Sequence, residues 1–223
     1  MAHRKQGYRF EDDWSQEEIK NDLTHMAGAV PIPVNIKIEA NNTVLNLDSV
    51  KRLLERAQKI AVTDCACRAK RRHCNSPLNT CLELNEAAQK GIDGGTSREL
   101  TLKEALDVLS SSHKSGLIHM AYIKDDLPRD DNIRYICSCC SCCCSVLAST
   151  LRFGLAPHLL KSQAVSSIDS TLCTSCGKCV ERCHFGAREK VGGKVALNRD
   201  MCFGCGLCVS TCPSMASSLI PFN

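Results

Sequence analysis

The pattern of hydrophobic and polar positions divides the chain into a sparsely patterned start, a mixed middle and a cysteine-dense end. Residues 1–29 are polar and charged, and Trp14, Ile19 and Leu23 are their clear apolar anchors. Over 30–38, apolar residues alternate with proline, asparagine and lysine. This alternation predicts an edge strand, because prolines are tolerated at the edges of sheets.

Helical periodicity and strand alternation follow along the middle of the chain. Helices are predicted over 48–60, 81–90, 101–115 and 145–153, with a short strand over 117–123 and a charged loop over 125–132. The helix signature is strongest at Thr101 and Glu104, which form a capping-box pattern. These elements predict an α+β chain whose N-terminal domain is mainly helical.

Two cysteine runs of identical spacing occupy the C-terminal part, and each has the form Cys-x2-Cys-x2-Cys-x3-Cys. This is the ligand pattern of a two-cluster [4Fe–4S] ferredoxin, in which the fourth cysteine of each run binds the other cluster. The ligands predicted for cluster 1 are Cys173, Cys176, Cys179 and Cys212. Those predicted for cluster 2 are Cys202, Cys205, Cys208 and Cys183. Zinc sites use separated cysteine pairs around one metal, so the doubled triplets favour iron–sulfur clusters.

Glycines and turns add detail to this C-terminal part. Gly177, Gly204 and Gly206 stand between cluster cysteines, where they let the backbone approach a cluster and hydrogen-bond its sulfur. A hairpin is predicted around Gly192 and Gly193. We therefore expect a polar N-terminal arm, a cysteine-rich α+β domain and a bacterial-type 2[4Fe–4S] ferredoxin-like domain, over 1–29, 30–160 and 161–223.

Ten further cysteines lie upstream of this ferredoxin pattern. They are Cys65, Cys67, Cys74, Cys81, Cys137, Cys139, Cys140, Cys142, Cys143 and Cys144. Six of them fall within eight residues and cannot all bind one cubane, because adjacent side chains diverge in most backbone conformations. Three hypotheses stay open: one or two more iron–sulfur clusters on the first four cysteines and part of the second group, a structural zinc on the first four, or redox-active thiols.

Composition and charge narrow the class of protein. The chain has 18 cysteines in 223 residues, and its start lacks the apolar segment of a secretory signal, so we expect a cytoplasmic protein of a reducing, anaerobic cell. The uncharged run over 135–151 is too short for a membrane span. The net charge is +4, and each bound cluster with its thiolates adds about −2. The basic excess is therefore internal counter-charge, and a pI near 8.3 argues against nucleic-acid binding.

From about residue 30 onward, the chain resembles a recurrent group of 4Fe–4S dicluster ferredoxin-type proteins of anaerobic bacteria and archaea. The residues that carry the resemblance are Cys65, Cys67, Arg68, Cys74, Pro77, Cys81 and Leu82, the segments 100–104 and 116–119, and the block 137–144. The chain departs from that group at Ser141, where glycine is common, and at His184, where proline is usual. The resemblance implies soluble electron transfer as one component of a larger redox system.

The remaining signals concern partners and catalysis. A basic loop contains Arg68, Lys70, Arg71 and Arg72, which we expect either to face solvent or to dock an acidic redox partner. We expect His184 to be a partly exposed surface residue, and the alternative is that its ring hydrogen-bonds a cluster sulfur and raises the reduction potential. The chain has no Gly-rich dinucleotide-binding loop, paired carboxylates or nucleophile–base set. It is therefore predicted to be an electron carrier or an oxidoreductase subunit rather than a stand-alone enzyme. The alternative is a catalytic reductase subunit whose N-terminal cysteine site performs the chemistry.

Overall fold

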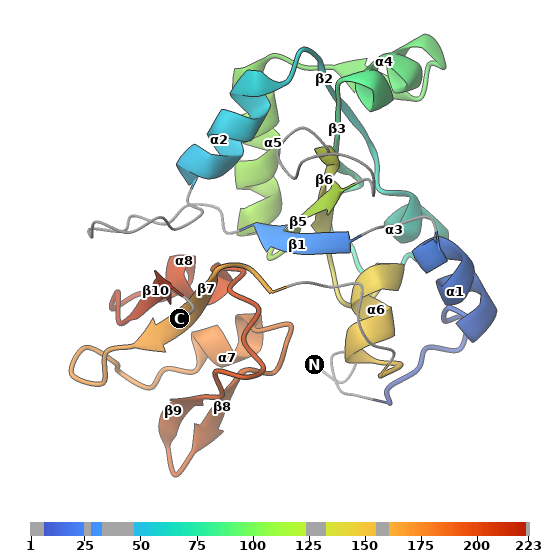
Figure 1. Cartoon of the computed structure of the whole chain (residues 1–223). Helices are drawn as coiled ribbons and strands as arrows, with labels where there is room; N and C mark the ends of the chain where they lie inside the picture. The colour runs from blue at the N-terminus through green and yellow to red at the C-terminus, as the bar shows by residue number, and fades with distance from the viewer. Residues whose placement is uncertain (1–6, 25–27, 33–46, 124–132, 155–160, 222–223) are drawn as a thin grey trace.

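The chain folds into a larger N-terminal part and a smaller C-terminal part (Figure 1). The computed structural model describes residues 7–24, 28–32, 47–123, 133–154 and 161–221. Most of the strand predicted over 30–38 and the whole of the loop predicted over 125–132 lie outside these ranges.

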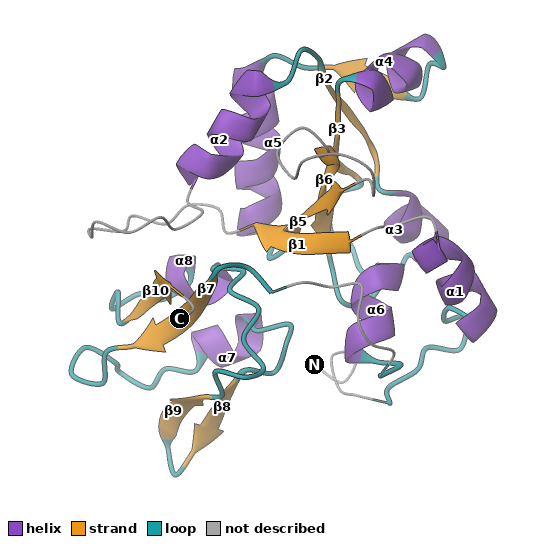
Figure 2. Ribbon diagram, viewed as in Figure 1, coloured by secondary structure: helices purple, strands orange, loops and turns teal. Residues whose placement is uncertain are grey.

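An antiparallel six-stranded sheet forms the centre of the N-terminal part, with the strand order β1-β5-β6-β3-β2-β4 (Figure 2). Its strands are β1 (Gly28–Ile32), β2 (Ile60–Asp64), β3 (Asn79–Leu84), β4 (Ser97–Glu99), β5 (Ile118–Ile123) and β6 (Ile133–Cys139). The strand predicted over 117–123 is thus confirmed as β5.

The prediction of a mainly helical N-terminal domain is wrong, because strands β2, β3, β4 and β6 were not recognised. In β3 and β6, cysteines occupy positions on the face opposite the apolar core, and they hide the period of two that marks a half-buried strand. In β3, Leu82 and Leu84 alternate with Cys81 and Glu83. The helix predicted from residue 81 begins only at Glu86.

One face of this sheet carries the apolar core of the N-terminal part. Helices α2 (Leu47–Arg56) and α5 (Leu102–Lys114) cover it and lie side by side in Figure 1. The core contains Val50, Leu54, Ile60, Val62, Leu82, Leu84, Leu100, Ala105, Leu109, Ala121 and Ile136. The capping box of α5 is confirmed, since the Thr101 hydroxyl accepts from the Glu104 amide and the Glu104 carboxylate accepts from the Thr101 amide.

The opposite face of the sheet carries cysteines. Because side chains alternate along a strand, Cys81 of β3 and Cys137 and Cys139 of β6 point away from the apolar core. Helices α1 (Gln16–Thr24), α3 (Ala66–Arg71) and α6 (Ser145–Leu151) lie on this side, and α4 (Glu86–Asp93) packs on β2, β3 and β4. The sheet therefore separates an apolar layer from a thiol-bearing layer.

The C-terminal part has two short two-stranded sheets and two short helices. Strand β7 (Ala164–Ile168) pairs with β10 (Ser217–Pro221), and β8 (Arg188–Val191) pairs with β9 (Lys194–Leu197) across the predicted Gly192–Gly193 turn. Helices α7 (Lys178–Arg182) and α8 (Leu207–Ser210) pack against each other. Each helix follows a cluster-cysteine loop, as the repeat in the sequence predicts.

The two parts share one hydrophobic core. Ile118 and Leu147 of the N-terminal part belong to the same buried cluster as Phe185 and Leu207 of the C-terminal part. The ring of Phe185 stacks on Phe203 with centroids 4.3 Å apart. Among the described residues, no helix is long and apolar enough to cross a membrane.

Two buried histidines lie at this junction and make the stability of the chain depend on pH. The rings of His113 and His119 stack 5.7 Å apart, and His113 Nε2 lies 2.6 Å from Ser210 Oγ in α8. Burial, and to a smaller extent the Arg182 cation, lowers the pKa of His113 to about 4. Burial, and to a smaller extent the neighbouring His113, lowers the pKa of His119 to about 3. Both rings are therefore neutral in the folded chain near neutral pH.

Lowering the pH from 6.5 to 5.5 should reduce the free energy of unfolding by about 1 kcal/mol per histidine. In this window the unfolded histidines bind protons that the buried rings do not, and the loss continues until the folded pKa is reached. Denaturant unfolding at several pH values measures the effect. The double variant His113→Gln/His119→Gln should show a shallower pH dependence than the wild type, and an unchanged slope would contradict this origin.

Candidate metal centres

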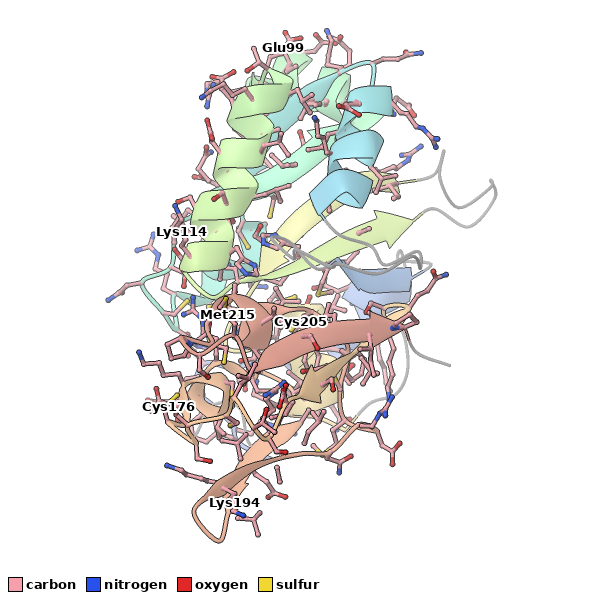
Figure 3. The ribbon with its side chains drawn as sticks, turned by 90° about the vertical axis from the view of Figure 1, so that its left-hand side faces the viewer. Glu99, Lys114, Cys176, Lys194, Cys205 and Met215 are labelled. Carbon is pink, nitrogen blue, oxygen red and sulfur yellow. The ribbon has the colours of Figure 1, made fainter. Side chains whose placement is uncertain are left out.

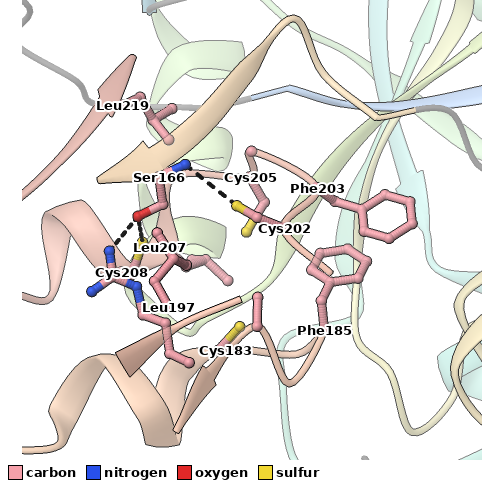
Figure 4. Close-up of a pocket in the computed structure, with 14 residues that line it drawn as sticks. Ser166, Cys183, Phe185, Leu197, Cys202, Phe203, Cys205, Leu207, Cys208 and Leu219 are labelled. Carbon is pink, nitrogen blue, oxygen red and sulfur yellow. Dashed lines mark hydrogen bonds between the residues drawn. The ribbon is translucent and has the colours of Figure 1, made fainter. Parts of the chain in front are cut away.

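The inner cavity of the C-terminal part is lined by the four cysteines predicted for cluster 2. These are Cys183, Cys202, Cys205 and Cys208, and Figure 4 shows them around one space. The Ser166 amide donates to Cys202 Sγ over 3.4 Å, and Ser166 Oγ lies 3.3 Å from Cys208 Sγ. Such hydrogen bonds stabilise negative charge on sulfur.

The outer cavity is lined by the four cysteines predicted for cluster 1. These are Cys173, Cys176, Cys179 and Cys212. Arg188 lines both cavities, is 3% exposed, and donates hydrogen bonds to Ser166 Oγ and, over 3.0 Å, to Ser217 Oγ. A buried guanidinium thus stands between two groups of four thiols. The motif spacing did not indicate this residue, since it lies outside both cysteine runs.

Replacing Arg188 with glutamine should lower the reduction potentials of centres in both cavities, by about 50–100 mV. The buried cation stabilises an added electron at either centre, and glutamine removes that charge while keeping donor groups. A redox titration followed by EPR gives both potentials. Arg188→Lys keeps the charge and should shift them less, so equal shifts in the two variants would contradict the electrostatic explanation.

The glycines predicted to allow close approach all line these cavities. Gly177 lines the outer cavity, and Gly204 and Gly206 line the inner one. All three have a positive φ, and at Gly204 a Cβ atom would lie 2.0 Å from Ser162 Oγ and 2.1 Å from the Ala164 carbonyl oxygen. The backbone at Gly204 therefore has no room for a side chain.

The two cavities differ in their access to solvent. Cys176 of the outer cavity is exposed, and it lies at the outer surface in Figure 3. Cys183 and Cys205 of the inner cavity are partly buried and pack against the core shared with the N-terminal part. The outer cavity thus faces solvent, and the inner cavity faces the sheet.

The ten upstream cysteines divide into two groups. The first, here called the Cys74 quartet, contains Cys74, Cys140, Cys142 and Cys143, whose sulfur atoms all lie within 4.8 Å of one another. The Cys74–Cys140 distance is 3.7 Å, and the Cys74–Cys143 and Cys142–Cys143 distances are 3.9 Å. Four thiolates about 2.3 Å from one tetrahedral ion would lie about 3.8 Å apart. The quartet therefore has the dimensions of a site for a single metal ion.

The second group, here called the six cavity cysteines, lines an open cavity of about 660 Å³ on the thiol-bearing face of the sheet. Its members are Cys65, Cys67, Cys81, Cys137, Cys139 and Cys144. The structure thus does not bring together the zinc set of Cys65, Cys67, Cys74 and Cys81, because Cys74 lies in the quartet. All eighteen cysteines fall within the described residues, and none of them forms a disulfide.

The cysteine block over 137–144 is shared between the two groups. The sequence predicts that the side chains of adjacent cysteines diverge. Cys139 and Cys140 do so, because Cys139 lines the cavity and Cys140 belongs to the quartet. Cys142 and Cys143 instead join the same group, because the chain turns there and both side chains reach Cys74. Strand β6 therefore provides Cys137 and Cys139 to the cavity, the residues after it provide Cys140, Cys142 and Cys143 to the quartet, and Cys144 at the start of α6 again lines the cavity.

The residues predicted to form a basic loop lie mostly on helix α3, and one of them, Arg68, is buried. Arg68 is 1% exposed and donates to the Ser138 carbonyl oxygen over 2.9 Å and to Thr80 Oγ1 over 3.1 Å, so it cannot dock a partner. Lys70 and Arg71 both pair with Glu18, each over 2.8 Å. Arg68 lies beside both cysteine groups and is internal counter-charge.

The prediction of a surface position for His184 is wrong. Its side chain is buried, with Nε2 2.8 Å from the Gly116 carbonyl oxygen and Nδ1 3.0 Å from Ser141 Oγ. Since the carbonyl can only accept, Nε2 carries the proton and the Ser141 hydroxyl donates to Nδ1. Both departures from the resembled group, His184 and Ser141, thus meet in one hydrogen bond between the two parts of the chain.

Comparison with known proteins identifies the C-terminal part. Residues 166–213 match the family model of the 4Fe–4S dicluster domain, and this segment contains all eight cysteines of the inner and outer cavities. No curated protein matches the chain. The C-terminal part is therefore a 4Fe–4S dicluster domain, which implies two [4Fe–4S] clusters, and its sulfur-lined cavities fit such a cofactor.

Proposed function

We propose that the chain is an iron–sulfur electron-transfer protein, a component of an anaerobic redox system that relays single electrons through its dicluster domain to its N-terminal part. The observation that carries the proposal is the sorting of eight cysteines into two cavities within a segment that matches the dicluster family. The clusters would supply one-electron transfer, and the protein supplies ligands, hydrogen bonds and counter-charge.

The ligands would divide as the cavities do. Cys173, Cys176, Cys179 and Cys212 would hold the outer cluster, and Cys202, Cys205, Cys208 and Cys183 the inner one. The exposed Cys176 places the outer cavity where a redox protein partner can approach. Docking of an acidic partner at Lys70, Arg71 and Arg72 stays a prediction. Lys70 and Arg72 are exposed, and Lys70 and Arg71 form ion pairs with Glu18.

A short bridge links the inner cavity to the Cys74 quartet. Cys183 lines the inner cavity, and the next residue, His184, accepts the hydrogen bond of Ser141, which stands between Cys140 and Cys142 of the quartet. Two metal centres would thus be joined through one side-chain hydrogen bond. This bridge supports a relay from the dicluster domain into the N-terminal part.

The Cys74 quartet would hold one tetrahedral Zn²⁺ or iron ion. Four thiolates at the observed spacing suit either metal, and a [4Fe–4S] cluster would need them further apart because each binds a different iron. Trp14 Nε1 donates to the Cys143 carbonyl oxygen over 2.9 Å, and Arg152 donates to that of Cys142 over 3.3 Å, so the loop is fixed from outside.

Metal and sulfide analysis of the anaerobically purified chain tests the proposed function. The dicluster domain should supply about eight irons with matching acid-labile sulfide, and EPR after reduction should show two interacting clusters. Cys176→Ser should perturb one cluster and Cys205→Ser the other. A chain without these irons, or one whose reduced clusters pass no electrons to any protein acceptor, would overturn the relay.

A second candidate function is that of a catalytic reductase subunit. The observation that favours it is the open cavity with six cysteines, which is wide enough to admit a small molecule. Reoxidation of the reduced protein by a protein-free filtrate of cell extract would favour the reductase. Reoxidation by a protein acceptor alone would favour the relay.

A further inference from the structure

We propose that the six cavity cysteines hold an iron–sulfur cluster of at least four irons, separate from the ion of the Cys74 quartet and from the two clusters of the dicluster domain. At least four of the six thiolates would bind it. This cluster goes beyond the proposed function, which assigns metals to the dicluster domain and the Cys74 quartet and none to these six cysteines.

The arrangement of the sulfur atoms distinguishes this group from the quartet. Within the described residues, the Cys74 quartet is the cysteine group whose sulfur atoms all lie within 4.8 Å of one another, whereas the six cavity cysteines are spread along the lining of an open cavity. A spread-out set cannot surround one tetrahedral ion, which takes four ligands at the corners of a compact figure. Thiolates spread along a wall suit a multi-iron cluster, whose ligands bind different irons.

The fold builds this wall from segments that are far apart in the sequence. Strands β3 and β6 provide Cys81, Cys137 and Cys139 from one face of the sheet. Cys65 and Cys67 stand at the start of α3, and Cys144 precedes α6. Figure 1 shows α3 and α6 on the same side of the sheet.

The size of the cavity argues against a purely structural role for these thiols. Protein interiors are packed with few voids larger than a water molecule, and buried free cysteine ordinarily packs as a small hydrophobic residue. Here six cysteines line about 660 Å³ of open space, with Asp64 and Tyr135 exposed beside it. A cluster would occupy that space and bind the thiols that surround it.

The charges around the cavity are those expected of a cluster site. Four or more thiolates around one cavity would carry several negative charges, and iron would supply the compensating positive charge while protons are released. The buried Arg68 guanidinium adds a fixed positive charge near Cys65 and Cys139.

The position of the cavity also suits a redox centre. Cys139 and Cys144 belong to the buried core that contains Phe185 and Leu207, and Cys183 and Cys205 of the inner cavity pack against the same core. The six cavity cysteines and the inner cavity are thus separated by packed side chains of one core. A cluster at each place would be connected through protein interior.

Iron, zinc and sulfide analysis of the full-length protein, purified without oxygen, tests this site. We expect about twelve irons or more per chain, beyond any zinc. The double variant Cys81→Ser/Cys137→Ser should lose at least four of them and keep the dicluster EPR signals. The matched control Cys74→Ser/Cys143→Ser, with the same chemical change in the quartet, should lose one metal ion and keep the others.

Alkylation of the native wild-type protein gives a second measurement that does not depend on variants folding. With iodoacetamide and peptide mass mapping, at least four of the six cavity cysteines should be protected until the iron is removed. About eight irons with at most one further metal ion, or alkylation of all six thiols in the native protein, would overturn the site. If the wild-type protein contained the irons that depend on Cys81 and Cys137 but lacked the eight irons of the dicluster domain, the proposed relay would be contradicted and this site would not be.

Discussion

Gly204→Ala is expected to abolish the metal centre of the inner cavity and to destabilise the chain by more than about 3 kcal/mol. A Cβ atom at this position would lie 2.0 Å from Ser162 Oγ and 2.1 Å from the Ala164 carbonyl oxygen. The hydroxyl can rotate away, but the carbonyl belongs to strand β7 and moves only with the backbone. The loop that carries Cys202 and Cys205 would have to shift, and cluster ligands tolerate little displacement.

Gly193→Ala is the matched control for this prediction. Gly193 has a φ of +79°, close to the +68° of Gly204, but nothing lies within 4 Å of its Cβ position. The Gly193→Ala substitution should lower the free energy of unfolding only by the strain of the left-handed backbone, about 1–2 kcal/mol. Iron content, EPR and thermal unfolding of both variants measure the difference. If both lose the same amount of iron and stability, close packing at Gly204 does not hold the cluster loop.

Asp13→Asn should destabilise the N-terminal part by about 3–5 kcal/mol. Asp13 pairs with Arg152, whose side chain is fully buried, through a bidentate contact that includes Nη2 and Oδ1 2.8 Å apart. Removing the carboxylate leaves a buried guanidinium without its counter-charge. The same guanidinium donates to the Cys142 carbonyl oxygen, so the Cys74 quartet should also lose its metal to a chelator more readily.

Glu11→Gln provides the control, because it makes the same charge change at an exposed position two residues away. It should change the free energy of unfolding by no more than about 0.5 kcal/mol. Denaturant unfolding and metal release to a chelator measure both effects. Equal stability of the Asp13 and Glu11 variants would show that the buried pair contributes nothing beyond surface charge.

The sequence predicted best those features that depend on short-range spacing. The doubled cysteine runs predicted a dicluster domain, and the family match and the two cavities are consistent with that prediction. The capping box of Thr101 and Glu104 predicted the start of α5, because both residues act within one helical turn. The Gly192–Gly193 turn was predicted for the same reason.

The division of the ten upstream cysteines could not be predicted, because it depends on pairing between distant strands. Cys81 and Cys137 meet only because β3 and β6 are neighbours in the sheet, and local periodicity does not indicate which strands will pair. The sulfur of Cys74 lies 3.7 Å from that of Cys140, which is 66 residues further along the chain, and not beside Cys65, Cys67 and Cys81. His184 likewise is buried only because the dicluster domain packs on the loop at Ser141.

The hydrophobic core that joins the two parts has a consequence for the rate of internal electron transfer. Phe185 and Leu207 are embedded among Ile118 and Leu147, so the dicluster domain cannot swing away without exposing apolar surface to water. Electron transfer between tethered but independent domains waits for a productive encounter and slows in a viscous solvent. In this chain the distance between the inner cavity and the thiol-bearing layer is set by folding. In the proposed relay, each intramolecular transfer would therefore start from the same geometry, and viscosity should slow only the encounter with an external partner.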